Sequence, residues 1–169
     1  MRWEIYVVSV MIASLVVGAE AAYATRDGRA GRRFAVVTMF GIAAFPLAVV
    51  LHNLASVTVD REETVSFIVG VLLAPAAITL GTIGLAFAMH RARPLAAAGF
   101  AVFAAGLGVF PLFVALLLAS AAAGSPVDAG GTVESVLLPL SLAIATAGAI
   151  VTAFALAADD GGAVQVRSA

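Results

Sequence analysis

Few side chains in this sequence could do chemistry, and those few lie at the edges of long apolar stretches. His52 and Asn53 follow directly on the apolar run that ends at Leu51. A histidine in such a place could relay protons or bind a solute or cation. The same pair could instead lie at a membrane interface, bonded to each other, to water or to a loop. His52 and Asn53 are therefore a candidate solute or proton site, and a purely interfacial role stays open.

Glu20 is the one acidic residue well inside an apolar stretch. A charge in lipid is costly, so this residue raises the question of a proton or cation role. Its carboxylate could also reach the interface and pair with an arginine of the segment that follows. His90, beside Arg91 and Arg93, ends another apolar stretch and is interpreted as an interfacial residue near a helix C-terminus.

The motifs of catalysis and of metal or nucleotide binding are missing from the sequence. There is no His-Glu-x-x-His zinc motif, no Gly-x-Ser-x-Gly elbow and no glycine-rich phosphate loop. The chain has no cysteine, which excludes disulfides and thiolate ligands. We therefore expect no catalytic residue, no metal site and no cofactor, and we expect that the protein is not an enzyme.

The elements that position these residues follow from the composition. Of the 169 residues 63% are hydrophobic and only 11% are charged, less than half the usual charged share of a soluble domain. A soluble fold of this size could not bury so much apolar surface, so the composition predicts lipid as the solvent. The net charge of −1 gives no general attraction to nucleic acid, and none is expected as a partner.

Five apolar stretches are long enough to cross a bilayer, which takes roughly 20 residues for about 30 Å of hydrocarbon. Backbone groups in lipid must be bonded within the segment, so each stretch is expected to be a helix. The predicted fold is an all-α bundle of five transmembrane helices in residues 1–158, followed by a short disordered tail at 159–169. The predicted spans are residues 5–25, 34–56, 66–90, 95–121 and 134–158.

The arginines set the direction of the spans. With the first connection in the cytoplasm, seven arginines lie inside, and only Arg2 and Arg61 lie outside. The positive-inside rule therefore predicts an external N-terminus and a cytoplasmic C-terminal tail. All nine basic residues are arginine, which suits the cell membrane of a prokaryote with a GC-rich genome. The seven internal arginines are Arg26, Arg29, Arg32, Arg33, Arg91, Arg93 and Arg167.

Residues 1–24 leave an alternative open. Arg2, an apolar run and the small-residue sequences Ala19-Glu-Ala21 or Ala22-Tyr-Ala24 are typical of a secretory signal peptide with its cleavage site. Cleavage would leave four helices and would place the four-arginine connection outside. That placement contradicts the charge bias, and we therefore favour the five-helix arrangement.

Two predicted helical hairpins are similar to each other. The second and fourth spans share Phe-Ala-Val, a glycine and then Phe-Pro-Leu, at residues 45–47 and 110–112. The third and fifth spans share Val-Leu-Leu just before a proline. We predict a two-helix hairpin duplicated in the same orientation, residues 34–90 and 99–158. The alternative is chance, because sequences rich in alanine, leucine and valine match one another easily.

Four prolines lie within the predicted spans. A proline inside a helix removes one backbone hydrogen bond and frees the carbonyl four residues earlier. Together these breaks could widen the outer half of the bundle into a vestibule with His52 and Asn53 near its rim, or they could give kinks alone. The predicted kinks are at Pro46, Pro75, Pro111 and Pro139.

Small residues recur four apart, as at Ala77 and Gly81, and with Gly99, Gly106 and Gly108 they predict close helix packing. The sequence favours a non-catalytic subunit or assembly partner that packs in the lipid bilayer with other membrane subunits or with itself. The alternative is a small transporter or channel with an outward-facing vestibule near His52 and Asn53. A carrier predicts a polar path to the membrane midplane, whereas a subunit predicts a packed apolar interior and an exposed small-residue face.

Overall fold

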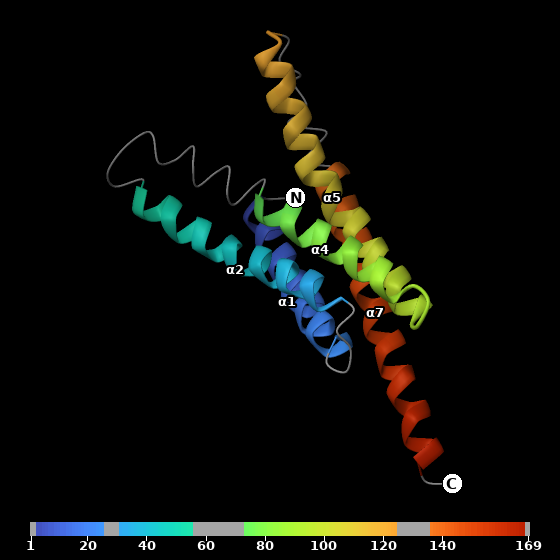
Figure 1. The fold of residues 1–169 in the computed structure, drawn as a ribbon. Coiled ribbons are helices and arrows are strands. Elements are labelled where there is room, and N and C mark those ends of the chain that lie inside the picture. The colour runs from blue at the N-terminus through green and yellow to red at the C-terminus, as the bar shows by residue number, and fades with distance from the viewer. Residues whose placement is uncertain (1–2, 26–30, 56–72, 125–135, 168–169) are drawn as a thin grey trace.

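All regular structure that the computed structural model describes is helical. The described residues are 3–25, 31–55, 73–124 and 136–167, and these ranges contain five α-helices and no strand. The expectation of an all-α fold is confirmed for them (Figure 1). The helices are α1 (Trp3–Ala24), α2 (Arg32–Ala55), α4 (Ala74–Met89), α5 (Pro94–Ala122) and α7 (Leu138–Arg167).

Two of these helices are long and apolar enough to cross a membrane. They are the 20-residue stretch Pro94–Phe113 of α5 and the 22-residue stretch Leu138–Asp159 of α7. The apolar stretches Val8–Ala24 and Ala74–Met89 are shorter. The third predicted span begins at residue 66, and its first seven residues lie outside the described ranges. By length and composition two spans are therefore supported, and the other three stay a prediction.

Helices that follow one another in the sequence lie side by side. α4 packs against α2 and α5, α5 packs against α7, and α1 lies against α2 and α7 (Figure 1). The connection from α4 to α5 is tight, because Arg93 N donates to Met89 O over 2.8 Å. α5 then begins at Pro94. The nitrogen of the first helical residue has no hydrogen-bond partner within the helix, so the absence of an N–H in proline costs no hydrogen bond there.

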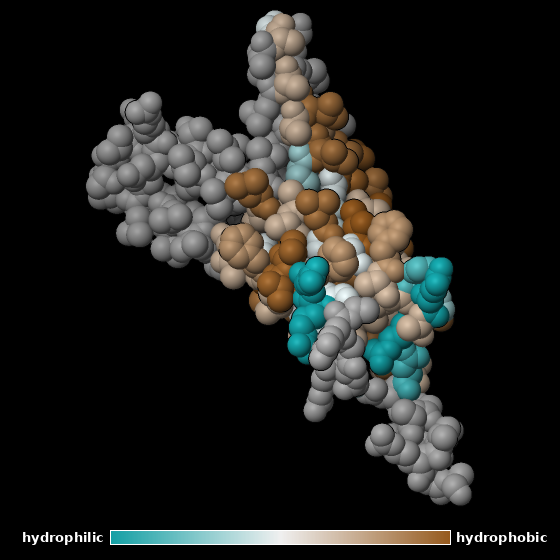
Figure 2. All heavy atoms as spheres, viewed as in Figure 1, coloured by the Kyte–Doolittle hydropathy of each residue, from teal (hydrophilic) through white to brown (hydrophobic). Residues whose placement is uncertain are grey.

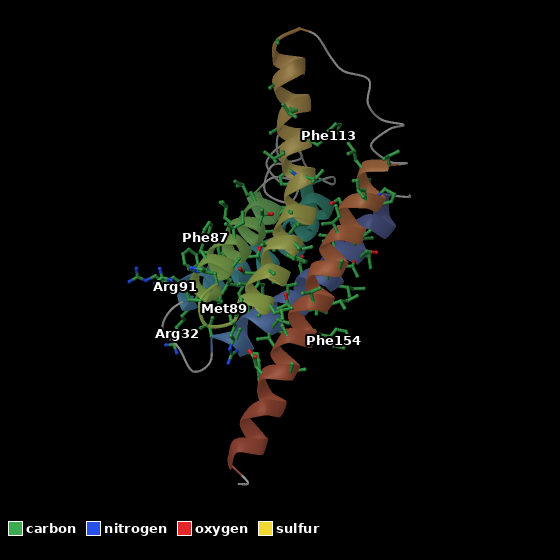
Figure 3. All side chains as sticks on the ribbon, turned by 90° about the vertical axis from the view of Figure 1, so that its right-hand side faces the viewer. Arg32, Phe87, Met89, Arg91, Phe113 and Phe154 are labelled. Carbon is green, nitrogen blue, oxygen red and sulfur yellow. The ribbon has the colours of Figure 1, made fainter. Side chains whose placement is uncertain are left out.

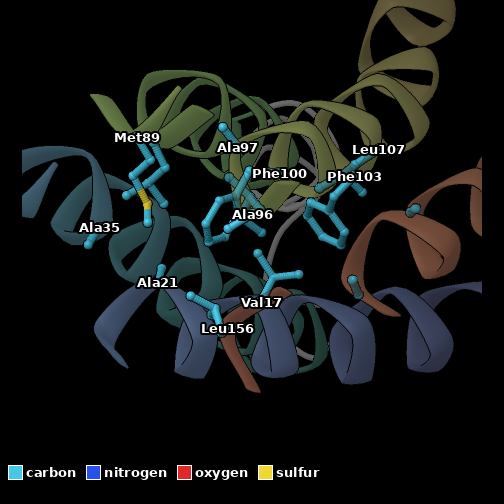
Figure 4. Packing of buried hydrophobic residues seen from close by; sticks show 14 of the residues in the cluster. Val17, Ala21, Ala35, Met89, Ala96, Ala97, Phe100, Phe103, Leu107 and Leu156 are labelled. Carbon is cyan, nitrogen blue, oxygen red and sulfur yellow. The ribbon is translucent and has the colours of Figure 1, made fainter. Parts of the chain in front are cut away.

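The core of the bundle is built around two phenylalanines of α5. Phe100 and Phe103 are both 0% exposed, and they point from α5 toward Val17 of α1 (Figure 4). Leu156 of α7 and Met89 of α4 belong to the same buried cluster. Side chains from separate helices thus close the interior of the described bundle with apolar groups.

α7 extends beyond its predicted span and reaches Arg167. The expectation of a disordered tail from residue 159 is therefore wrong. A helix that is already nucleated gains one backbone hydrogen bond for each residue it adds, which carries it through the charged and glycine-rich segment. Asp159 also pairs with Arg93, with 3.4 Å between Oδ2 and Nε.

Candidate functional site

His52 and Asn53 lie near the C-terminal end of α2. The side chains of residues 45–55 lie outside the described part, so the solute site and the vestibule expected there stay predictions. Glu20 lies elsewhere on the bundle. A Cβ atom on nearby Gly18 would lie 2.6 Å from Ile42 Cδ1, and His52 follows Ile42 by ten residues, about 15 Å along a helix. The structure therefore does not bring Glu20 together with His52.

Glu20 is buried in α1, with 8% of its surface exposed. Among the described residues neither carboxylate oxygen has a hydrogen-bond partner, and no ion pair joins Glu20 to any of them. A pair with an arginine of the connection that follows α1 was expected. Arg26 and Arg29 lie outside the described residues, so that part stays a prediction, and no ion pair joins Glu20 to Arg32 or Arg33. Burying a polar group without a hydrogen-bond partner costs free energy, so Glu20 stays a candidate for a role beyond packing.

The four prolines occupy two different kinds of position. Pro46 and Pro111 lie inside α2 and α5, where a proline removes one backbone hydrogen bond of the helix. Pro75 and Pro139 are the second residues of α4 and α7, and the residues just before each helix have π-helical geometry. A proline in the first turn of an α-helix is tolerated, and a π-helical turn is a recognised way to change the register at such a point. Kinks at these prolines stay predictions.

Glycines hold α2 and α4 close together. A Cβ atom on Gly81 of α4 would lie 2.7 Å from Thr38 N and 2.9 Å from Phe34 O. From the other side, a Cβ atom on Gly41 of α2 would lie 2.9 Å from Ile78 N. Real Cβ atoms do not approach backbone atoms so closely, so any larger residue at Gly41 or Gly81 would push the helices apart.

The pair α5 and α7 has the same arrangement. A Cβ atom on Gly148 of α7 would lie 2.7 Å from Gly99 O and from Phe103 Cα. In the opposite direction, a Cβ atom on Gly106 of α5 would lie 2.8 Å from Ser141 O and closer still to Ala145 N. In each pair both helices therefore contribute a glycine to the crossing, and α5 adds a second one, Gly99, which faces Thr152 N and Gly148 O. Spacing of small residues singled out Gly81, Gly99 and Gly106, but it missed Gly41 and Gly148.

The two crossings correspond in sequence position. Gly106 follows Gly41 by 65 residues, and Phe103 follows Thr38 by the same number. In the other helix of each pair, Gly148 follows Gly81 by 67 residues. The same offset takes Ile78, which Gly41 faces, to Ala145, which Gly106 faces.

Hydroxyl groups in the interior are mostly bonded within their own helix. Thr38 Oγ1 donates to Phe34 O over 2.9 Å, and Thr152 Oγ1 donates to Gly148 O over 3.0 Å. Thr82 of α4 bonds in the same way to the carbonyl four residues earlier. Ser141 differs, because its Oγ donates across the crossing to Gly106 O over 2.7 Å. These hydroxyls therefore satisfy the backbone and leave no continuous polar path among the residues named.

Charged side chains gather at one end of the bundle. Figure 3 places Arg32 of α2 and Arg91 of the α4–α5 connection at this end. Arg33 is next to the first of them, and Arg93 lies in the same connection and pairs with Asp159. Figure 2 shows patches of hydrophilic residues toward one end of the bundle and mostly hydrophobic residues on the face above them. Among described side chains the remaining charged group is Glu20, which is buried about one turn before the end of α1.

An apolar groove runs along the surface between α4 and α5. It has a volume of about 750 Å³, and its floor on α5 is made of small residues. Its polar ends are His90, beside the arginines, and Thr79, whose buried hydroxyl has no hydrogen-bond partner in the part of the chain that the structure describes. The small residues on α5 are Ala97, Ala98, Ala101, Ala104, Ala105 and Gly108.

The groove is suited to holding an apolar group rather than to carrying out a reaction. His90 at its end is exposed, and its Nδ1–H donates to Phe87 O over 2.7 Å. Within the described ranges no three histidine, aspartate or glutamate side chains come together as a metal site would require. Comparison with protein-family models, with curated proteins and with solved structures finds no match for this chain.

Proposed function

We propose that this chain is an integral membrane protein of five spans, with its arginine-rich end in the cytoplasm of a prokaryotic cell. One observation carries the proposal: large apolar side chains are exposed on all five described helices, and the exposed charges whose side chains the structure describes lie at one end. Examples are Phe40 at 71%, Phe87 at 73% and Phe154 at 73% exposed. Apolar patches of this extent are rare on soluble monomers and are the normal surface of a protein in lipid.

The charged end supports the proposed orientation. Arg32 and Arg33 at the start of α2 and Arg91 and Arg93 in the α4–α5 connection all lie there. The positive-inside rule places such an end in the cytoplasm. The external N-terminus and the cytoplasmic tail of the proposal follow from this assignment.

We also propose that the two hairpins, residues 34–90 and 99–158, arose by duplication in the same orientation. The glycine crossings support this. The glycines and the residues they face recur 65 residues later in the first helix of the second hairpin and 67 residues later in its second helix. Chance matches in an alanine-rich sequence would not be expected to reproduce which residues face each other across a crossing.

For function, we propose a non-catalytic subunit or assembly partner that acts through helix packing. The apolar core around Phe100 and Phe103 and the internally bonded threonines support this class over a carrier, which needs a polar path. The groove between α4 and α5 adds an exposed small-residue face. A transporter with a vestibule at His52 and Asn53 stays the alternative, since those side chains lie outside the described residues.

The membrane arrangement can be tested by cysteine labelling, because the chain has no cysteine of its own. Single variants Ala92→Cys at the arginine end, Ala123→Cys at the far end of α5 and Phe154→Cys on the apolar surface are treated with a membrane-impermeant maleimide. We expect Ala123→Cys to react in intact cells, Ala92→Cys only after permeabilisation, and Phe154→Cys not at all. Reaction of Ala92→Cys in intact cells would contradict the proposed orientation. Reaction of Phe154→Cys in intact membranes would contradict the proposal that this residue faces lipid.

The subunit proposal can be tested with a photo-crosslinking side chain at one exposed position on each helix. Suitable positions are Ile12, Phe40, Leu80, Leu112 and Phe154. A near-stoichiometric adduct with one protein, at positions on one side of the bundle, would support a subunit. Adducts with lipid alone at all five positions, or scattered adducts with many proteins, would contradict it.

A further inference from the structure

We propose that the groove between α4 and α5 binds one acyl chain of an anionic phospholipid, whose head group contacts Arg91 at the arginine end. The proposal rests on the proposed membrane location of the chain. The ligand is a phospholipid, its acyl chain lies along the groove with the head group at the arginine end, and Arg91 contacts that head group.

The dimensions of the groove fit an alkyl chain. Its wall on α5 runs from Pro94 to Leu112, which is about 27 Å at 1.5 Å per residue. An extended alkyl chain can lie along this length, with its carbon atoms about 4 Å from those of the groove.

The walls suit the same ligand. On α5 the groove presents alanines and a glycine, whose flat surface lets a flexible chain lie close along the helix. On α4 the walls include Ile83 and Phe87, which are 38% and 73% exposed. A saturated chain needs no hydrogen-bond partner, and the groove offers almost none along its length.

The charge at one end gives the ligand its direction. Both His90 and Pro94 line the groove, and Arg91 and Arg93 lie in the connection between them. Arg93 is paired with Asp159, whereas Arg91 is exposed and has no ion pair with a described residue. Figure 3 shows Arg91 at the same end of the bundle as Phe87 of the groove wall. Basic residues between transmembrane helices on the cytoplasmic side are a recurrent site for anionic head groups.

The test uses the full chain purified in a mild detergent, with phosphatidylglycerol and phosphatidylcholine added in equal amounts as probes. Native mass spectrometry counts the lipids that remain bound. We expect one phosphatidylglycerol to be retained in preference to phosphatidylcholine. Ala101→Phe, which fills the groove, should abolish this retention, and Arg91→Gln should lower the preference about fivefold, equivalent to about 1 kcal/mol for one arginine near a charged surface.

Matched controls separate the groove from general effects. Ala147→Phe adds the same ring at an exposed position of α7, and Arg32→Gln removes a different exposed arginine at the same end. Both should keep the lipid, and thermal unfolding should show that every variant is folded. Equal retention of both lipids, or retention by Ala101→Phe, would overturn the proposal. So would loss of a protein partner in Ala101→Phe with lipid binding unchanged, because the occupant would then be a helix. The cysteine labelling above tests the membrane location separately, so the lipid site can fail while that location stands.

Discussion

Gly148 of α7 lies so close to Phe103 of α5 that a Cβ atom on the glycine would fall 2.7 Å from the phenylalanine Cα. Gly81 of α4 meets Thr38 of α2 in the same way, 2.7 Å from the backbone nitrogen. In the lipid environment proposed for this chain the hydrophobic effect does not drive helices together, so close backbone contact supplies the packing. These two contacts should therefore be sensitive points for the stability of the bundle.

Replacing either glycine with alanine should destabilise the protein. Gly148→Ala and Gly81→Ala would each force a backbone shift, and we expect the free energy of unfolding to fall by about 1–3 kcal/mol. Gly18→Ala is the matched control, because its new methyl group would meet the movable ends of Ile42 and Met39 rather than backbone. Alanine also has the higher helix propensity, so Gly18→Ala should be neutral or stabilising. Unfolding in detergent micelles measures all three, and a loss at Gly18 equal to that at Gly148 would contradict the role given to the crossings.

Two buried serines should respond in opposite ways to the same substitution. Ser141→Ala removes the hydrogen bond from Oγ to Gly106 O, and we expect a loss of about 0.5–1.5 kcal/mol. Ser14 Oγ is buried with no partner among the described residues, so Ser14→Ala should leave the stability unchanged or raise it. The difference between the two free energies of unfolding is the readout. A larger loss at Ser14 than at Ser141 would show that the contacts of these hydroxyls are other than described.

The helical class of the protein could be predicted because it follows from composition alone. Apolar residues fill whole stretches of the chain, and lipid permits such stretches to be helices. Helix ends were predicted to within a few residues at Trp3, Arg32 and Ala122, where charge or a loop begins. The end of α7 was not, because nothing in residues 159–162 shows that a helix already nucleated upstream will continue.

The correspondence between the two helical hairpins could be predicted only in part from the sequence. The Phe-Pro-Leu matches give an offset of 65 residues between the second and fourth spans, and the glycine contacts have the same offset. The Val-Leu-Leu matches also give 65 residues for the third and fifth spans, whereas Gly81 and Gly148 differ by 67. That match is therefore out of register with the contacts by two residues. A close approach of two backbones depends on which residues face each other, and a run of similar apolar letters does not fix that.

The groove could not have been found from the sequence. Its floor is a row of alanines, and alanine is so common in this chain that the row carries no signal. Only the contact of α4 with α5 shows that these alanines line one depression with His90 at its end. His90 was interpreted as an interfacial residue, which fits its exposed position and its bond to Phe87 O.

Removing the charge of Glu20 should not destabilise the protein. Glu20→Gln keeps the shape of the side chain and ends the need to bury a carboxylate whose oxygens have no partner among the described residues. We expect the free energy of unfolding to be unchanged or higher, by up to about 1–3 kcal/mol. Ala19→Gln, at the exposed position beside it, controls for the introduction of an amide. A marked loss of stability in Glu20→Gln alone would mean that the carboxylate is paired in the folded protein.

The pair between Arg93 and Asp159 should contribute little to stability even though it joins α7 to the α4–α5 connection. Its side chains are 30% and 48% exposed, so water screens the attraction. We expect Asp159→Asn to lower the free energy of unfolding by less than about 1 kcal/mol. A double-mutant cycle with Arg93→Gln isolates the interaction, and repeating it at about 1 M salt should bring the coupling close to zero. A coupling that persists at high salt would instead indicate that the pair is shielded from solvent, as it would be if the head group of a bound lipid covered it.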